Sequence, residues 1–597
     1  MGDGLDNDRS NASDEGKPVI GLGVPGNELP NRVKKSERTS NVTSDGERAR
    51  ERGNEKFAKG DVVGAMKDYE EAARANANDV AARTNLAECY LRGRNFVQAL
   101  ECAERALMCE MDSSQGKSQK VKAMYKKAMA LNGLARYADA SATTTAALAE
   151  CDDKEDATVK ATLEKVRLEC EMLKEQAFMG NFDMGALYLN RMGASFRRCA
   201  DYVGPVQVSR LVDGRRGLTT TSAVKAGDLL LVQSPLTAAG FNKGVEQNLV
   251  RGLFAAAQQN GADWEILKAL PTRAEDEANE PPSMSVFRKH LGTKDTDVVV
   301  PTSQEELAIL PKIVSHCAIS GRKTVGVWAV PSFINHSCAP NAHRINVGQV
   351  LLVFASRDMA PGCEVTIKYY DTLIPKKERD AFAAKRGYSC NCHRCAFEST
   401  GDVDAATKAA LEAEGKDEGA GPVTRLVGSL RRKLKPVFKT FQDELAVMKA
   451  TKGEKVPNIN PLLELRDWFE NRLNALGLSE SQAAMVRMSC FSMYETLSLG
   501  LSFVGAGEQK HLLIKRMLSD LNVVDPGGFH ACKQSTILAN NARRAFGKNA
   551  AEIVEATNIM VDIHRLRYGP VDGEDLIEIV RRTEQSIADE TGEFCEL

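Results

Sequence analysis

The sequence has no apolar run that approaches the roughly 18 consecutive residues needed to span a bilayer. Its first ten residues, MGDGLDNDRS, lack the apolar core of a secretory signal peptide. They also miss the N-myristoylation pattern, because Asp6 stands where Ser or Thr is required. We therefore expect no membrane partner, and a location in the cytoplasm, the nucleus or both.

A large excess of either charge sign is also missing. The chain contains 79 Lys and Arg residues against 81 Asp and Glu residues, which gives a formal net charge of −2. A chain this close to neutrality has no overall electrostatic attraction for phosphate backbones, so we expect no direct nucleic-acid partner. The 15 cysteines are odd in number and scattered, which is typical of a reducing compartment where thiols stay free or bind metal.

Large apolar residues are scarce in residues 1–45, which are rich in Gly, Asn, Ser, Asp and Lys. Such a segment cannot bury enough surface to offset its chain entropy, and we interpret it as a disordered arm. The rest of the 597 residues is long enough for several domains.

Residues 46–178 are expected to form a repeat array with a capping helix, and the internal repeat itself lies in residues 46–148. A period of about 34 residues with small residues at helix crossings is the tetratricopeptide pattern, in which paired helices approach closely. The following stretch EDATVKATLEKVRLECEMLKEQAF has helical periodicity and is expected to cap the array. The alanine pairs that carry the repeat are spaced by 34 and then 41 residues: Ala65 with Ala72, Ala99 with Ala106, and Ala140 with Ala147.

From residue 203 the sequence changes to short β-rich runs broken by glycine, such as PVQVSRLVDGRRGLTTTSAVKAGDLLLVQSPL. A mostly helical insert interrupts this β domain at about 241–325. From 404 to 597, apolar residues recur three and four apart, as in helices. The predicted fold class is multidomain α+β, with an all-α repeat array, a β-rich domain at 203–385, and an all-α C-terminal domain that could itself be tetratricopeptide-like.

The segment YSCNCHRC holds a C-x-C-x-x-C cluster of Cys390, Cys392 and Cys395. Three thiols this close in a reduced protein are good zinc ligands, and tetrahedral structural zinc requires a fourth. His393 lies between the ligands on the same short loop and would strain it. Cys338, in the segment FINHSCAPN, is the better candidate and would fasten the cysteine loop onto the Asn-His pair.

Four segments together resemble the SET-domain protein lysine methyltransferases, and most of all the SET-and-MYND (SMYD) branch with its tetratricopeptide-SET relatives. No MYND zinc finger is visible, since residues 241–325 hold only His290, His316 and Cys317 as candidate ligands. The resemblance implies a SET domain of small sheets around a knotted segment at 203–385, with a post-SET zinc loop at 386–400. The segments are, in order, GRRGL, FINHSCAPN, GCEVTIKYYD and YSCNCHRC.

The resemblance also implies S-adenosylmethionine as cofactor and one structural zinc ion. It puts Asn335 and His336 in the knot beside the cofactor, with Cys338 as the fourth zinc ligand. Tyr369 aligns with the catalytic tyrosine of the family and also lines the cofactor site. Because Tyr369 follows the expected strand EVTIK, alternation predicts that it points into the site and that its neighbour does not.

Other cofactor contacts carried over from the family are the backbone at Gly214, Arg216 and Gly217, and an adenine-stacking ring at Tyr388. The chain departs from the family at Arg215, where a second glycine is common. It departs again at Ser315 and His316, where an Asn-Ser pair is common.

The helical array carries a second candidate site. In chaperone-binding tetratricopeptide proteins, five polar residues clamp a C-terminal carboxylate. An acidic peptide ending in a free carboxylate, such as a heat-shock chaperone tail, suits this set. The matching residues here are Arg50, Asn54, Asn85, Lys122 and Lys126.

These observations predict an S-adenosylmethionine-dependent protein-lysine methyltransferase, acting on a histone or another protein, with a tetratricopeptide peptide-binding module. The first alternative is a catalytically silent SET scaffold that works as a chaperone-linked adaptor. The second is a methyltransferase acting on a group other than lysine. The sequence does not identify the substrate.

Overall fold

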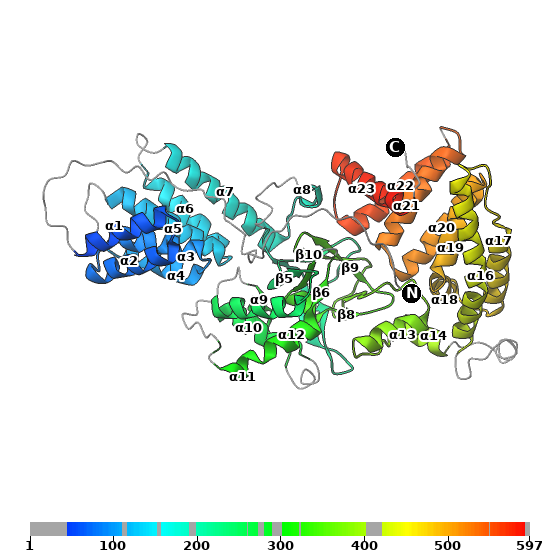
Figure 1. Ribbon diagram of the computed structural model, residues 1–597, viewed down its shortest axis with the longest axis horizontal. Coiled ribbons are helices and arrows are strands. Elements are labelled where there is room, and N and C mark those ends of the chain that lie inside the picture. The colour runs from blue at the N-terminus through cyan, green and yellow to red at the C-terminus, as the bar shows by residue number, and fades with distance from the viewer. Residues whose placement is uncertain are drawn as a thin grey trace. The chain divides into compact units, whose positions relative to one another are not determined.

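The computed structural model describes residues 45–109, 116–151, 157–189, 199–259, 261–272, 280–288, 301, 303–321, 324–400, 421–548 and 550–591. The predicted disordered arm lies outside this part, apart from Asp45. The chain divides into two compact units (Figure 1). The first comprises residues 1–130 and 142–167, and the second comprises 131–141 and 168–597.

Antiparallel helix pairs build the N-terminal region. Short side chains begin three of its helices, because the carboxylates of Asp61 and Asp79 and the amide oxygen of Asn95 accept hydrogen bonds from backbone N–H groups of the first turn. The helices are α1 (Asp45–Ala58), α2 (Val62–Ala75), α3 (Val80–Arg92), α4 (Phe96–Leu107), α5 (Gly116–Gly133), α6 (Tyr137–Ala149) and α7 (Ala157–Met179).

The repeated small residues lie where these helices cross. Ala65, Ala72 and Ala99 are fully buried, as the repeat predicts. Gly53 of α1 packs so close to Tyr69 of α2 that an added Cβ would lie 2.7 Å from the ring. Small residues on one helix and a large ring on the next therefore set the close helix spacing.

The central region contains small sheets. Within the described residues, strand order is β1-β4-β10-β9, β11-β8, β2-β3 and β5-β7-β6. The strands are β1 (Tyr202–Val203), β2 (Val206–Arg210), β3 (Arg216–Thr220), β4 (Leu229–Gln233), β5 (Thr237–Gly240), β6 (Ile319–Ser320), β7 (Thr324–Val327), β8 (Asn335–His336), β9 (Ala342–Val347), β10 (Val350–Ala355) and β11 (Thr366–Ile367).

Strand β10 contributes to two hydrophobic cores at once. Its six residues VLLVFA are all buried, and alternate side chains point to opposite faces of the sheet. Leu351 and Val353 belong to the core under the helical insert. Leu352 and Phe354 belong to the core of the C-terminal helices. The four-stranded sheet is therefore covered on both faces, which explains why this strand lacks the polar alternation of a half-exposed strand.

The predicted insert is helical and packs on the β domain. Trp264 and Phe287 of the insert join the same core as Trp328 and Phe333 of the chain that follows it. Its elements are α9 (Val245–Gln259), α10 (Gly261–Ala269), η2 (Met284–Phe287), α11 (Gln304–Leu307) and α12 (Ile309–Cys317), followed by η4 (Val330–Phe333) after β7.

Two short strands bring distant segments together at the centre of the β domain. In the parallel pair β8 and β11, Asn335 lies opposite Thr366 and His336 lies opposite Ile367. Strand β11 ends two residues before Tyr369. The strand is shorter than the expected EVTIK, and Tyr369 lies in the bend that follows it.

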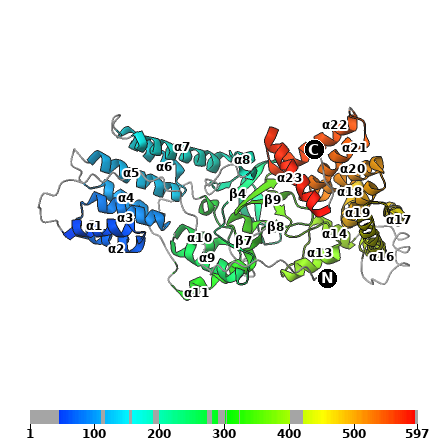
Figure 2. The same ribbon diagram turned by 45° about the horizontal axis from the view of Figure 1, so that its top comes forward.

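The C-terminal region is all helical (Figure 2). Ser479 and Gln482 form a capping box at the start of α18. No helix in the described ranges has the length and hydropathy to span a bilayer. The remaining helices are α8 (Met184–Leu189), α13 (Lys376–Lys385), α14 (His393–Thr400), α16 (Pro422–Ala450), α17 (Asn460–Ala475), α18 (Glu480–Met488), α19 (Phe491–Phe503), α20 (Gly507–Val524), α21 (Phe529–Ala545), α22 (Ala551–Tyr568) and α23 (Gly573–Thr591).

These regions confirm the predicted fold class: a helical array, a β-rich centre with a helical insert, and a helical C-terminal part.

Candidate functional site

Four cysteine sulfurs form a compact cluster. Cys338 follows β8, Cys390 and Cys392 lie in the loop before α14, and Cys395 lies on α14. The Cys338 Sγ is 3.8 Å from the Cys390 Sγ and 3.5 Å from the Cys395 Sγ, and all four sulfurs lie within 4.8 Å of one another. Sulfurs around tetrahedral zinc, at a Zn–S length of about 2.3 Å, are separated by about 3.8 Å. The geometry therefore fits one zinc ion.

The structure separates the two candidates for the fourth ligand. His393 is exposed and is not part of the sulfur cluster, whereas Cys338 is fully buried within it. The cysteine loop is thereby joined to the segment that carries Asn335 and His336, 52 residues earlier than Cys390.

Both ring nitrogens of His336 are engaged. Nδ1 accepts a hydrogen bond from the backbone N–H of Tyr369 at 3.1 Å, so the neutral ring carries its proton on Nε2. Nε2 lies 3.3 Å from the Cys338 Sγ and donates toward that sulfur. His336 therefore connects the cysteine cluster to the bend at Tyr369, and this arrangement does not leave it a free nitrogen to act as a general base.

The side chain of Asn335 is fixed by two acceptors. Its Nδ2 donates to the Arg216 carbonyl oxygen at 3.1 Å and to Glu364 Oε1 at 2.9 Å. Its Oδ1 is then the atom that can accept a bond from a ligand. Glu364 was not singled out from the sequence, because only the fold brings it beside Asn335.

Three tyrosine rings surround His336. The ring centroids of Tyr369, Tyr370 and Tyr388 lie 5.3, 4.6 and 5.8 Å from that of His336. Since both Tyr369 and Tyr370 contact His336, strand alternation does not separate their roles. Their hydroxyls differ instead. Tyr369 donates to the Ile334 carbonyl oxygen at 2.7 Å, whereas the buried Tyr370 hydroxyl interacts with the Tyr388 hydroxyl.

Burial raises the pKa of the Tyr369 hydroxyl above its ordinary value and that of Tyr388 to about 12. Both hydroxyls therefore remain protonated at neutral pH. They are available as hydrogen-bond donors and do not serve as bases.

The glycine segment forms the hairpin between β2 and β3. Gly214 has a φ of 85°, which the turn requires. At Gly217 an added Cβ would lie 2.8 Å from Leu211 Cδ1 and 3.0 Å from Asn335 Nδ2, so close approach to the Asn335 side chain explains this glycine. The side chain of Arg216 is buried and donates to the Ala269 carbonyl oxygen at 3.1 Å.

The comparisons with known proteins agree with this geometry. The family model for the SET domain matches residues 215–370, and the model for the tetratricopeptide repeat matches residues 56–122. The chain carries a SET domain behind tetratricopeptide repeats. Strands β3 to β11, Asn335, His336 and Tyr369 all lie within the matched SET range.

Relatives of the SET domain are lysine methyltransferases by name. Histone-lysine N-methyltransferase ATXR2 of Arabidopsis thaliana is 40% identical over 78 residues, which cover 12% of this chain and 16% of the relative. Histone-lysine N-methyltransferase SMYD3 of Homo sapiens is 39% identical over 82 residues, covering 14% and 18%. ATXR4 of Arabidopsis thaliana is 31% identical over 135 residues, covering 19% and 41%. The chain thus matches less than half the length of each.

Two solved structures also match. The Arabidopsis OM64 TPR domain is 24% identical, with 21% of this chain and 94% of that chain covered and a TM-score of 0.18. Yeast Tom70 is 11% identical, with 91% and 97% covered and a TM-score of 0.20. Scores this low do not extend the likeness to the arrangement of the whole chain.

A buried group of charges supports the cysteine cluster of the SET domain. Arg379 and Arg394 are fully buried on either side of the buried Glu398. Arg379 Nη1 lies 3.3 Å from the Cys395 Sγ, and Arg394 Nη1 donates to the Cys338 carbonyl oxygen at 3.1 Å. A zinc ion with four thiolates carries a net charge of −2, so these arginines compensate the charge of a loaded site.

We expect Arg379→Met to weaken zinc binding by about 10- to 100-fold, as is typical for loss of a partner behind a metal ligand. Methionine keeps an unbranched side chain but removes the donor to the Cys395 sulfur, together with the ion pair to Glu398 and the hydrogen bond to the Ile374 carbonyl oxygen. Competition with a chromogenic zinc chelator measures the affinity, and Arg431→Met, at an exposed arginine that pairs with Glu378, is the matched control. Unchanged zinc affinity in the Arg379 variant would contradict the assignment.

Arg394 and Lys368 also join the SET domain to the C-terminal helices. Arg394 Nη2 donates to Ser489 Oγ of the segment after α18 at 2.8 Å. Lys368, next to Tyr369, pairs with the buried Asp525 at 2.6 Å. Burial opposes ionisation of Asp525, but Lys368 holds its pKa below the usual value. The bend that carries Tyr369 is thus anchored from the C-terminal helices.

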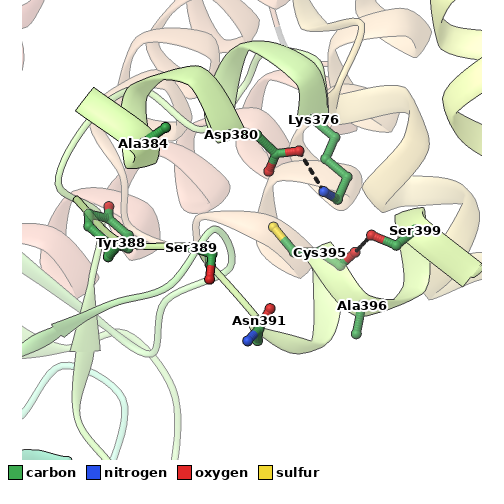
Figure 3. Close-up of a pocket in the computed structure, with 10 residues that line it drawn as sticks. Lys376, Asp380, Ala384, Tyr388, Ser389, Asn391, Cys395, Ala396 and Ser399 are labelled. Carbon is green, nitrogen blue, oxygen red and sulfur yellow. Dashed lines mark hydrogen bonds and ion pairs between the residues drawn. The ribbon is translucent and has the colours of Figure 1, made fainter. Parts of the chain in front are cut away.

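Beside the cysteine cluster lies a cavity of about 460 Å³ between α13 and α14 (Figure 3). Tyr388, Cys390 and Cys395 line it, so it opens onto the post-SET loop. Lys376 and Asp380 pair across one wall at 2.6 Å.

Four of the five clamp residues of the repeat array make side-chain contacts within the array. Asn54 Oδ1 accepts from Asn85 Nδ2 at 3.0 Å and from the Tyr69 hydroxyl at 2.9 Å. Arg50 pairs with Asp79 at 3.3 Å, and Lys126 pairs with Glu88. The structure therefore brings the two asparagines together, while two of the cations already have acidic neighbours. A peptide carboxylate would compete with those neighbours. The fifth residue, Lys122, is half-buried on the same helix as Lys126.

Proposed function

We propose that the protein is an S-adenosylmethionine-dependent protein-lysine N-methyltransferase whose tetratricopeptide repeats bind an acidic peptide. The observation that carries the proposal is the meeting of Asn335, His336, Tyr369 and the four-cysteine cluster within one matched SET domain. The names of the relatives support the reaction class.

The residues present fit the cofactor. When bound, S-adenosylmethionine supplies the methyl group from its positively charged sulfonium. Asn335 offers Oδ1 to a polar ligand, and the close approach of Gly217 to Asn335 keeps bulk away from that side chain. The buried Tyr388 hydroxyl interacts with that of Tyr370, and the Tyr388 ring lies 6.1 Å from the Tyr369 ring, so its position beside the site is fixed.

Tyr369 orients the reacting groups in this proposal. Its hydroxyl is held by the Ile334 carbonyl oxygen, and its backbone N–H is held by His336. Methyl transfer to a lysine amine depends chiefly on alignment of the reacting atoms, and such positioning needs a fixed hydroxyl. The amine must also be neutral, which burial of the lysine favours because desolvation lowers its pKa.

The test is incubation of the purified protein with isotopically labelled S-adenosylmethionine and a protein extract, followed by mapping of the labelled residue. We expect label on lysine side chains. Label on another residue type would favour the second alternative. No transfer and no cofactor binding in calorimetry would favour the silent scaffold and overturn the proposal.

For the repeats, we expect Lys122→Ala with Lys126→Ala to abolish binding of a peptide that ends in Glu-Glu-Val-Asp. Each charged contact contributes about 1.5–3 kcal/mol, and because Lys126 must leave Glu88 to bind, Lys122 should contribute the larger share. Calorimetry at low salt measures the affinity, with Lys127→Ala as the control, since Lys127 pairs with Glu104 outside the clamp. If the unmutated protein does not bind this peptide, the assignment of the five clamp residues is wrong.

A further inference from the structure

We propose that one face of α13 selects substrates in which an acidic residue stands next to the target lysine. The inference rests on the proposed methyltransferase function and names its substrate class. The face consists of Phe382, Lys385 and the helix C-cap Arg386, and we call it the α13 recognition face. Positions i, i+3 and i+4 lie on the same side of a helix.

The α13 recognition face lies directly on the two tyrosines of the SET site. The ring of Phe382 stacks on Tyr370, with centroids 5.4 Å apart and an interplanar angle of 21°. The Arg386 guanidinium carbon lies 6.0 Å from the centre of the Tyr369 ring. Any group placed against the Tyr369 hydroxyl is therefore within a few residues' reach of this face.

The α13 recognition face is exposed as well as close to the site. Phe382 is 45% exposed although it is a large aromatic residue, and Lys385 and Arg386 are exposed beside it. The Lys385 Nζ lies 5.8 Å from the Phe382 ring centre. An exposed aromatic ring flanked by two cations offers both apolar contact and positive charge to a peptide that crosses it.

The charge around Tyr369 is positive. Arg344 from β9 adds a guanidinium group to that of Arg386, and Arg386 acts electrostatically on both Tyr369 and Arg344. The acidic residues of α13 are already neutralised, because Glu378 pairs with Arg431 and Asp380 pairs with Lys376. Asp213 likewise pairs with Arg215 at 2.6 Å.

A basic peptide is a poor match for such a surface. Neighbours of the target lysine that carry positive charge would face two exposed cations, whereas Asp or Glu would be attracted to them. Repulsion of peptides with basic neighbours contributes to specificity together with attraction of peptides with acidic neighbours. The opposite wall of α13, formed by Lys376, Asp380 and Ala384, lines the cavity of Figure 3 and does not contribute to this face.

The experiment uses the full-length protein and a peptide library with one fixed central lysine and randomised flanking positions. We expect the methylated fraction to be enriched in Asp and Glu next to the lysine, with kcat/KM about fivefold or more above that of matched peptides with flanking Arg. The preference should shrink as salt rises, because the contacts are exposed.

Two charge reversals locate the preference. Lys385→Glu and Arg386→Glu should each lower the acidic preference, mainly through KM, and the double variant should favour peptides with flanking Arg. Lys377→Glu makes the same charge change nine residues before Arg386 on the opposite side of α13, where Lys377 is exposed, and should leave the preference intact. Equal selectivity in the double variant and the parent would overturn the proposal.

Failure of the proposed reaction is distinguishable from failure of this inference. Binding of a fluorescent peptide, with norleucine in place of lysine between two Asp residues, is measured by anisotropy in the same variants. Preferential binding that is lost in the double variant, without methyl transfer to any peptide, supports the α13 recognition face and rejects the reaction. Methyl transfer without a charge preference, or no binding of the acidic peptide, rejects the proposal that the α13 recognition face selects acidic substrates.

Discussion

Replacing Tyr369 by phenylalanine is expected to lower methyl transfer by about 100- to 1,000-fold, which corresponds to about 2.7–4 kcal/mol. The variant removes the hydroxyl that donates to the Ile334 carbonyl oxygen and leaves the ring packed near His336. Cofactor affinity and folding should change little. Single-turnover transfer of the labelled methyl group measures the effect.

Tyr370→Phe is the matched control. Its ring also contacts His336 and stacks on Phe382, but its buried hydroxyl interacts with the Tyr388 hydroxyl and not with the Ile334 carbonyl oxygen. Losing one neutral hydrogen bond should cost about 0.5–1.5 kcal/mol of stability, and turnover should fall far less than in the Tyr369 variant. If the Tyr370 variant loses more activity than the Tyr369 variant, or if Tyr369→Phe equals the parent, the assignment of Tyr369 is wrong.

Replacing Cys392 by serine is expected to reduce the bound zinc from one ion per chain to nearly none. A structural zinc site typically stabilises its fold by about 10–16 kcal/mol relative to the metal-free peptide, and a site with three thiolates loses much of that energy. Because His336 and Arg394 connect the cluster to the Tyr369 bend and to the segment after α18, the metal-free loop should also weaken cofactor binding.

Elemental analysis and cofactor calorimetry measure both effects. Cys363→Ser is the control, since Cys363 lies in the same SET domain and outside the sulfur cluster. Full zinc content in the Cys392 variant, or the absence of zinc from parent protein purified without chelator, would contradict the metal assignment.

The metal ligands that lie close together in the sequence were the easiest part of the site to predict. The ligands Cys390, Cys392 and Cys395 lie within six residues, so their chemistry is readable from one segment. Cys338 could be inferred because its segment resembles a family motif. The repeat array could be recognised for a similar reason, since pairs of alanines recur at spacings of 34 and 41 residues and lie fully buried at the helix crossings.

Partners that meet only through the fold could not be read from the sequence. Arg379, Arg394 and Glu398 resemble ordinary exposed helix charges, and their burial follows from the packing of α14 against the C-terminal helices. The alternation of side chains along a strand did not separate Tyr369 from Tyr370, because β11 is only two residues long and ends before both tyrosines. The contact between Asp525 and Lys368 joins positions 157 residues apart.

The alternation of β10 between two cores makes the folding of the central and C-terminal regions a shared event. Leu352 and Phe354 would face water if the C-terminal helices detached, and each such side chain costs about 1.5–3 kcal/mol when exposed. Leu351 and Val353, on the same six-residue strand, hold the insert core. We therefore expect the SET domain and the helices from α16 onward to unfold together in one cooperative transition.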